Sequence, residues 1–326
     1  MWALSPSYRP LRPGAEHSFC DHVAVAPPAL VRLIAAVIAL AVVVAGCTDD
    51  QTAEAPVPPA AATPTPAAEP TTPIPAEPDV REERYGDAAS QFGELWLPAG
   101  DAANPVVVLI HGGFWQDAFD LRLMDPLARD LVGRGYAVWN IEYRRVGNDG
   151  GGWPTTFDDV AAAIDHLAAL GGSAPLDLDQ VALVGHSAGG HLALWAAGRE
   201  AIAPGDPWSA PVVVPALTVG QAPVADLARA SAERAGGGAV DLFLGGSVDE
   251  VPERYAAATP NADVSGELLI VLGSADSIVL PQWAGGAPGF EAAQVVVTGA
   301  DHFDVIDPTH PSWDVVLDEL ARVLDS

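Results

Sequence analysis

The sequence predicts an α/β domain in which a mostly parallel sheet is flanked by helices on both faces. Two observations predict it: short apolar runs alternate with amphipathic stretches between residues 81 and 326, and several of the runs contain no polar residue. Uninterrupted apolar runs are typical of parallel strands covered on both faces, and regular alternation of strand and helix favours a doubly wound sheet. No repeat is visible and no segment is long enough for a large cap domain, so we expect one domain over residues 81–326.

The first 46 residues have the features of a secretory signal. Thirteen apolar residues follow Arg32 without interruption, from Leu33 to Ala45, a length that suits a signal better than a membrane span. The step from Val44 to Cys47 resembles the lipobox of bacterial lipoproteins, in which the signal is cut before the cysteine and the thiol receives a lipid. We therefore expect residues 1–46 to be removed, Cys47 to be lipidated and the protein to be exported and anchored to the membrane. An uncleaved signal anchor is the alternative, and it exports the chain as well.

Residues 47–80 are expected to form an extended tether. The stretch from Thr48 to Val80 contains nine prolines among alanines and threonines, with too little apolar mass for a core. Such a composition favours polyproline-like backbone. We expect this tether to hold the following domain clear of the membrane.

Within that domain, strands are expected at short runs of mostly apolar residues, several of which are uninterrupted. The runs are residues 106–110, 137–143, 181–185, 216–220, 268–273 and 293–297, with an earlier antiparallel strand at 91–97. Helices are expected where apolar side chains recur every three or four residues, so that one stripe faces the sheet. Such stripes run from Leu121 to Val132, from Val160 to Leu167 and from Trp313 to Leu324.

The composition excludes several classes of function. All 15 basic residues are arginine, against 43 acidic residues, and the formal net charge is −28. Without lysine, the chain cannot perform P-loop, protein-kinase or pyridoxal-phosphate chemistry, each of which uses that side chain. So acidic a surface repels phosphate backbones, and we expect no nucleic-acid partner. The two cysteines are too few for a disulfide scaffold or a cysteine-rich metal site.

Ser187 has the surroundings of a catalytic nucleophile. It lies in the pentad Gly185-His-Ser-Ala-Gly189, directly after an expected strand and before a helical stretch. A strand that turns sharply into a helix needs small residues around the serine, and the turn exposes the hydroxyl at the edge of the sheet. The start of the helix adds unpaired N–H groups that can stabilise an oxyanion. We expect the neighbouring His186 to pack or hydrogen-bond locally.

A second turn follows the first expected parallel strand. There the sequence reads His111-Gly-Gly-Phe-Trp115, and a glycine pair lets backbone amides approach a bound carbonyl closely. An ordinary glycine turn with two core aromatic residues is the alternative.

With these two motifs the chain resembles the α/β-hydrolase superfamily, in particular its carboxylesterase, feruloyl-esterase-like and kynurenine-formamidase-like members. The resemblance extends from about Tyr85 to the end of the chain, with Thr259 standing where serine is usual. It implies an α/β-hydrolase fold and an oxyanion hole formed by Gly112, Gly113 and the amide of Ala188. It also implies that neither a metal nor an organic cofactor is required.

The base and the acid are sought after Ser187, because the chain order in this fold is serine, acid, histidine. His302 follows the expected strand 293–297 across a short loop, whereas His310 precedes the last helix and resembles a surface residue. Asp276 follows the strand 268–273 and is the favoured acid, with Asp226 as the alternative. The expected triad is therefore Ser187, Asp276 and His302.

The function expected from this triad is hydrolysis of small to medium carboxylic esters through an acyl-enzyme. Cleavage of N-acyl bonds by an amidase or arylformamidase is one alternative, and an inactive hydrolase fold that serves as a binding module is another. The expected partner is a small-molecule ester or amide, and the sequence does not indicate an oligomeric state. Two structural roles are also expected: Arg144 pairs with a carboxylate to brace its loop, and residues 199–215, with Trp208, form part of a small lid.

Overall fold

The computed structural model describes residues 78–261, 263–285, 290 and 292–325. The predicted signal at 1–46, Cys47 and the tether as far as residue 77 lie outside the described residues. Within the described part of the chain, no helix has both the length and the apolar character that crossing a membrane requires.

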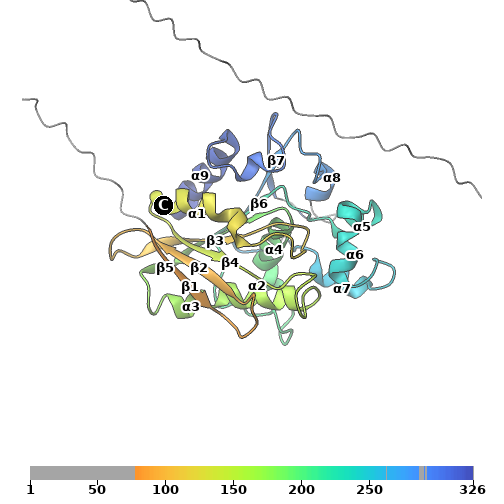
Figure 1. The fold of residues 1–326 in the computed structure, drawn as a ribbon, viewed down its shortest axis with the longest axis horizontal. Helices are drawn as coiled ribbons and strands as arrows, with labels where there is room; N and C mark the ends of the chain where they lie inside the picture. Colours follow the sequence, from red (N-terminus) through yellow and green to blue (C-terminus); the bar gives the residue numbers. More distant parts are fainter. Residues whose placement is uncertain (1–77, 262, 286–289, 291, 326) are drawn as a thin grey trace, which may run out of the picture. The chain divides into compact units, whose positions relative to one another are not determined.

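One eight-stranded sheet forms the centre of the domain, in the order β1-β2-β4-β3-β5-β6-β7-β8 (Figure 1). The first two strands pair antiparallel, β2 pairs antiparallel with β4, and every later pair is parallel. The strands are β1 (Asp79–Arg84), β2 (Phe92–Leu97), β3 (Asn104–Ile110), β4 (Ala137–Ile141), β5 (Leu176–His186), β6 (Leu217–Gln221), β7 (Glu267–Gly273) and β8 (Ala293–Val297). The mostly parallel sheet confirms the predicted fold class.

The six predicted parallel strands and the antiparallel β2 are all present, with ends that differ from the predicted ones by a few residues. The exception is β1, which the sequence analysis did not predict. Five of its six residues are charged and almost all are exposed, so no apolar run marks it. Charged side chains are typical of an edge strand, where they discourage pairing with other chains. Because β1 begins at Asp79, the sheet includes the last two residues of the segment predicted to be tether.

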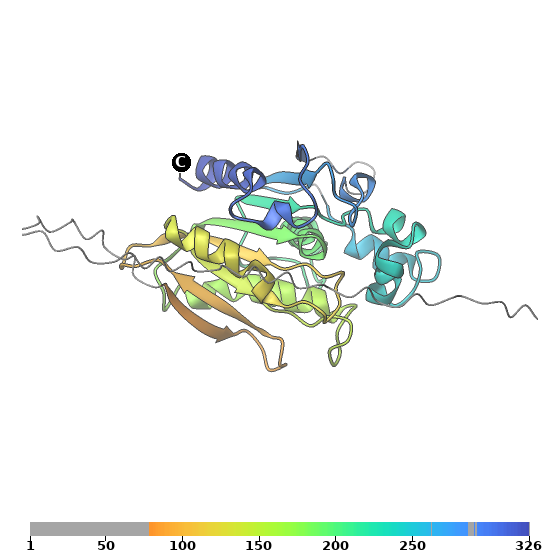
Figure 2. The same ribbon diagram turned by 45° about the horizontal axis from the view of Figure 1, so that its top comes forward.

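Helices cover the two faces of the sheet. They are α1 (Asp125–Gly133), α2 (Thr155–Asp165), α3 (Leu167–Leu170), α4 (Ala188–Ala197), α5 (Leu227–Ala232), α6 (Ala239–Leu244), α7 (Pro252–Ala258), α8 (Pro281–Ala284) and α9 (Pro311–Leu324). Short 3-10 turns add η1 (Leu121–Met124), η2 (Gly198–Ala201), η3 (Ala235–Gly237) and η4 (Asp304–Ile306). Figure 2 shows the hairpin of β1 and β2, in orange, along one margin of the sheet.

Successive residues of the central strands enter two different cores. Val106, Val108 and Ile110 of β3 pack with α2 and α4 in one core. Val107 and Leu109 of the same strand pack with α1 and α9 in the other. This double burial explains the uninterrupted apolar runs of the sequence, since both faces of each parallel strand are covered.

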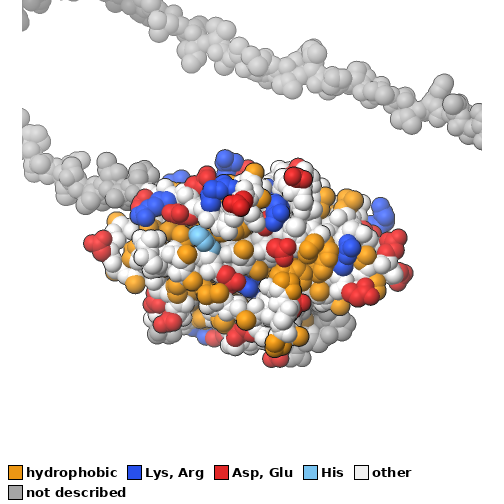
Figure 3. All heavy atoms as spheres, turned by 90° about the horizontal axis from the view of Figure 1, so that it is seen from below, with side chains coloured by type: hydrophobic (Ala, Val, Ile, Leu, Met, Phe, Trp, Pro, Cys, Tyr) orange, Lys and Arg blue, Asp and Glu red, His pale blue; other side chains and the backbone are white. Residues whose placement is uncertain are grey.

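The parallel strands end together at one edge of the sheet. Ile110 at the end of β3 is paired with Gly185 in β5, and Gly273 at the end of β7 is paired with Val297 at the end of β8. The loops that follow these strands therefore emerge at the same edge, which is where ligands bind in open α/β sheets. On the face drawn in Figure 3, acidic side chains are spread among arginines and apolar groups rather than gathered in one patch.

Candidate active site

Ser187 occupies a strained turn between β5 and α4. Its backbone has φ 55° and ψ −119°, a conformation that costs a non-glycine residue about 1–3 kcal/mol and is found mainly at functional sites. The turn is closely packed: a Cβ on Gly185 would lie 2.2 Å from the carbonyl oxygen of Gly189, and one on Gly189 would lie 2.1 Å from that of Ile110. Both glycines of the pentad are therefore required by the space around them.

Asp276 and His302 are brought together by the loops after β7 and β8. The Nδ1 atom of His302 is 2.7 Å from Oδ2 of Asp276, and both side chains are buried. The other carboxylate oxygen of Asp276 accepts hydrogen bonds from the amides of Ile278 and Val279, at 2.8 and 2.9 Å. Burial alone raises the pKa of Asp276, but the bonds from His302 and from these amides outweigh it and hold that pKa below its ordinary value. The carboxylate thus stays ionised beside the imidazole.

The alternative acid lies elsewhere. Asp226 is the N-cap of α5, where its side chain accepts a hydrogen bond from the amide of Arg229 at 3.0 Å. Capping the first turn of a helix is a common structural role for aspartate. His310 likewise caps α9, and His191 on α4 bonds to the carbonyl oxygen of Ala258 at 2.8 Å.

His186 joins the serine turn to the histidine loop. Its Nε2 atom is 2.9 Å from the carbonyl oxygen of His302, and the centroids of the two rings are 4.6 Å apart. Burial, followed by the neighbouring His302, lowers the pKa of His186 to about 3. The ring is therefore neutral at physiological pH and donates its Nε2 proton to the carbonyl. The local bonding expected for His186 is in fact a contact with a residue 116 positions away.

The glycine pair lies against the serine. A Cβ on Gly112 would be 2.9 Å from the Cβ of Ser187 and 2.9 Å from the carbonyl oxygen of His186, so the bare backbone of Gly112 contacts the serine turn directly. Gly113 has φ 116°, and the ring of Phe119 packs against it. Ala188 is the first residue of α4, and its amide is among those that a helix leaves without an intrahelical partner. All three residues predicted for the oxyanion hole thus lie on the two turns that meet at Ser187.

Two aromatic residues after the glycine pair adopt left-handed backbone conformations. Phe114 has φ 51° and Trp115 has φ 55°, values that bulky residues rarely take. The indole of Trp115 is fully buried and stacks on Phe243 of α6, with ring centroids 4.7 Å apart and planes 4° from parallel. The unfavourable backbone is therefore balanced by packing in the core.

The segment after β4 supplies contacts that the sequence analysis did not assign. Glu142 is 3% exposed, is hydrogen-bonded to the side chain of His111 and forms an ion pair with Arg145. The neighbouring Arg144 pairs with the buried Asp159, at 2.6 Å, and so braces its loop as predicted. The sequence does show two charged residues, Glu142 and Arg144, directly after a buried strand, which indicates that they have partners. Those partners lie too far along the chain to be identified from the sequence.

Exposed apolar side chains accompany the candidate catalytic residues. Ile278 follows Asp276 by two residues, Phe303 follows His302, and Phe119 lies on Gly113. They are 38%, 45% and 43% exposed. Large apolar side chains at the surface around a buried polar site are typical of a site that binds an apolar group.

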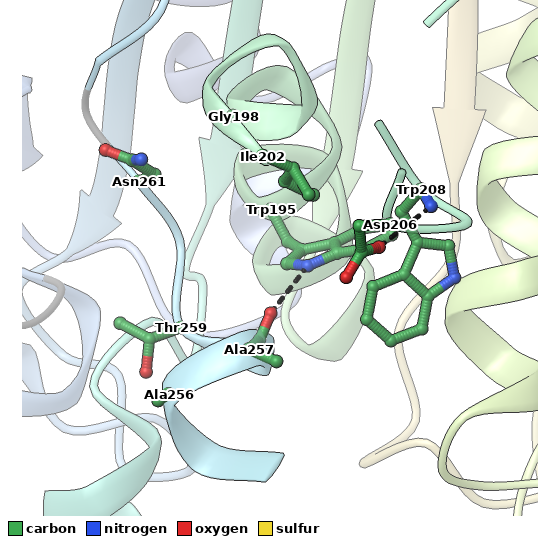
Figure 4. Close-up of a pocket in the computed structure, with 9 residues that line it drawn as sticks. All are labelled: Trp195, Gly198, Ile202, Asp206, Trp208, Ala256, Ala257, Thr259 and Asn261. Atoms are coloured by element: carbon green, nitrogen blue, oxygen red, sulfur yellow. Dashed lines mark hydrogen bonds between the residues drawn. The ribbon is translucent and has the colours of Figure 1, made fainter. Parts of the chain in front are cut away.

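A cavity of about 260 Å³ lies beside the carboxyl-terminal half of α4 (Figure 4). Trp195, which lines it, is eight residues beyond Ser187, about 12 Å along a helix. Trp208, from the segment predicted as a lid, also lines it, packing on Trp195 and Phe157 and donating its indole proton to Asp158 of α2. The prediction of a lid was wrong, because burial of this large ring places the segment on α2 and the distal half of α4.

Comparisons with known proteins agree with this architecture. The BD-FAE family model matches residues 94–284. Comparison with curated proteins finds no match.

Several solved structures of esterases share the fold. Esterase B from Lactobacillus rhamnosis, solved with a tributyrin phosphonate, is 24% identical, with 78% of this chain and 87% of the esterase covered and a TM-score of 0.64. A truncated carbohydrate esterase from gut microbiota is 18% identical, with 77% and 97% covered and a TM-score of 0.64. Esterase Est2 from Thermogutta terrifontis is 18% identical, with 75% and 92% covered and a TM-score of 0.57. At these identities the likeness establishes the α/β-hydrolase fold.

Proposed function

Because the chain belongs to the BD-FAE family of esterase-like α/β hydrolases, we propose that it hydrolyses carboxylic esters through an acyl-enzyme on Ser187. The observation that carries the proposal is the buried 2.7 Å contact between His302 and Asp276, at the sheet edge where the strained Ser187 turn also emerges. An imidazole oriented by a carboxylate is the base that a serine nucleophile requires.

The reaction follows from these roles. The Ser187 oxygen attacks the ester carbonyl while His302 accepts its proton, and Asp276 stabilises the imidazolium that results. The amides of Gly112, Gly113 and Ala188 stabilise the oxyanion, each such donor typically contributing about 2.7–4 kcal/mol. The carbon–oxygen bond to the alcohol then breaks, and the alcohol leaves with the proton from His302. Water, deprotonated by the same histidine, attacks the acyl group, and the acid and free serine are released.

The surroundings favour an uncharged, apolar substrate. Phe119, Ile278 and Phe303 offer apolar surface beside the oxyanion turn, the acid and the base. The net charge of −28 disfavours anionic substrates.

The test uses a fluorophosphonate probe, which modifies an activated serine. The domain from residue 79 onward is expected to be labelled, and Ser187→Ala is expected to remain unlabelled. Labelling of both proteins, or of neither, would contradict the proposal. Rates on nitrophenyl esters of increasing chain length, set beside N-formyl aromatic amines, then distinguish an esterase from a formamidase.

Anchoring through Cys47 is proposed from the sequence alone. If the lipobox is processed, expression in a bacterial host gives a mature protein that begins at a lipid-modified Cys47, and Cys47→Ala abolishes the modification. Mass spectrometry of the amino terminus measures this. An unmodified amino terminus in the wild-type protein would refute the anchor.

A further inference from the structure

We propose that Glu142 is a positioning residue that fixes the oxyanion loop, residues 111–121, so that the amides of Gly112 and Gly113 face the substrate carbonyl. The proposal rests on the proposed function for the identity of the oxyanion hole. Its structural part concerns only which residues hold this loop in place.

Glu142 binds both ends of the oxyanion loop. One carboxylate oxygen is 3.2 Å from Nε2 of His111, the first residue of the loop. The other accepts a hydrogen bond from the amide of Leu121, the last residue, at 3.2 Å. The carboxylate also forms an ion pair with Arg145, at 2.9 Å, and accepts a hydrogen bond from the amide of Tyr143, at 2.9 Å. Burial alone raises the pKa of Glu142, but the bond from His111 and the charge of Arg145 hold that pKa below its ordinary value, so the group stays anionic.

The residues after Glu142 also bind the same loop, at its first residue and in its interior. The hydroxyl of Tyr143 donates to the carbonyl oxygen of His111 at 2.7 Å, and the two rings stack. Arg145 donates to the carbonyl oxygen of Phe119. The amide of Val146 donates a hydrogen bond to the carbonyl oxygen of Trp115, at 2.8 Å. The carbonyl oxygen of Val146 accepts a hydrogen bond from the amide of Asp117, at 3.1 Å. The clamp segment, residues 142–146, therefore contacts the loop at both ends and at three points between them.

The loop needs this support because of its backbone. Gly113, Phe114 and Trp115 have positive φ angles in succession, and each non-glycine residue in this region costs about 1–3 kcal/mol unless its surroundings enforce it. An oxyanion hole acts only if its donors are fixed before the reaction begins. Within the described part of the chain, Glu142 is the only residue of the clamp segment whose side chain bonds to both ends of the loop.

Glu142→Gln tests the proposal, because it keeps the shape of the side chain and removes its charge and half of its acceptors. The matched control is Asp165→Asn. Asp165 also forms an ion pair with a buried arginine, Arg199, at 2.7 Å. It accepts a hydrogen bond, at 3.0 Å, from the amide of Val212, which lies in a distant segment of the chain. Both variants are expected to lower the melting temperature, Glu142→Gln by the larger amount, because the side chain of Glu142 is 4% exposed and that of Asp165 is 24% exposed.

Only Glu142→Gln is expected to impair the oxyanion hole. We expect kcat to fall by about 10- to 100-fold with KM changed by less than about threefold, and inhibition by a trifluoromethyl ketone to weaken by a similar factor. Amide hydrogen exchange over residues 111–121 is expected to accelerate in this variant alone. An unchanged kcat, an unchanged exchange rate, or an equal loss of activity in Asp165→Asn would overturn the proposal.

Two further outcomes are distinguished in advance. If Glu142→Gln does not fold, Tyr143→Phe removes the single bond to the His111 carbonyl and is expected to raise exchange in the loop and lower kcat by about 3- to 10-fold. Unchanged exchange and kcat in that variant would also overturn the proposal. If the wild-type domain does not react with the fluorophosphonate, the proposed function fails, whereas the exchange measurement still decides whether Glu142 fixes the loop.

Discussion

The two halves of the candidate active site are held in place by different kinds of contact. On the acid–base side, Asp276 accepts hydrogen bonds from the amides two and three residues beyond it. Asp301 likewise accepts hydrogen bonds from the amides two and three residues beyond it. On the oxyanion side, Glu142 reaches residues 31 and 21 positions away. On the first side, local loop contacts therefore supplement the long-range contacts of His302 with Asp276 and His186. On the second side, tertiary contacts between two buried segments hold the loop.

This difference predicts different responses to substitution. Residues around the acid and the base, such as Phe303 and Ile278, are partly exposed, whereas His111, Trp115 and Tyr143 on the oxyanion side are fully buried. Changes on the acid–base side should affect activity more than stability. Changes on the oxyanion side should affect both, because the same bonds position the loop and complete the core.

The largest expected effect separates activity from stability on the acid–base side. Asp276→Asn keeps the shape of the side chain but no longer favours the His302 tautomer that accepts the serine proton, so kcat is expected to fall about 10⁴-fold. Asp226→Asn, which only alters the cap of α5, is expected to retain activity within about threefold, since asparagine also caps helices well. Steady-state kinetics on a nitrophenyl ester measure both. The reverse ranking would assign the acid to Asp226.

An intermediate effect is expected from Gly112→Ala on the oxyanion side. The added methyl group would lie 2.9 Å from both the Cβ of Ser187 and the carbonyl oxygen of His186, so the turn must move. We expect kcat to fall about 10²- to 10³-fold, as when one oxyanion donor is lost, together with a lower melting temperature. The control is Gly299→Ala in the loop before His302, where φ is 85° but no atom lies within 4 Å of the new Cβ. It should cost about 1–2 kcal/mol of stability and leave kcat nearly unchanged; equal losses of kcat would remove the distinction between the two sides.

The smallest expected effect concerns acid stability. His191 lies against Trp115, with ring centroids 5.4 Å apart, and burial lowers its pKa from 6.5 to about 4. Below pH 6.5 the unfolded chain therefore binds a proton at this position that the folded chain does not bind until about pH 4. The free energy of unfolding must fall over this range as the pH is lowered, and His191 should account for about 2 kcal/mol of that fall at pH 5. Urea unfolding at pH 8 and pH 5 should show a smaller fall in His191→Gln; an identical fall would mean that His191 titrates normally.

The sequence was sufficient for the parts of the molecule that depend on local pattern. Uninterrupted apolar runs predicted the parallel strands because both faces of the sheet are covered, and chain order led to Asp276 and His302, which the structure brings together. It was insufficient where contacts are distant or local preference is overridden. The charged residues of β1 gave no strand signal, and aromatic residues at 114 and 115 did not predict left-handed backbone. Nor did Glu142 reveal that its partners are His111 and Leu121.

The direction of β1 determines where the domain is attached to whatever precedes it. Asp79 is paired with Leu97, the last residue of β2, and β2 runs antiparallel to β4. The chain therefore enters the sheet at the edge opposite the one from which His111 and Ser187 emerge. An affinity tag joined directly ahead of Asp79 is therefore attached at the sheet edge remote from these two turns.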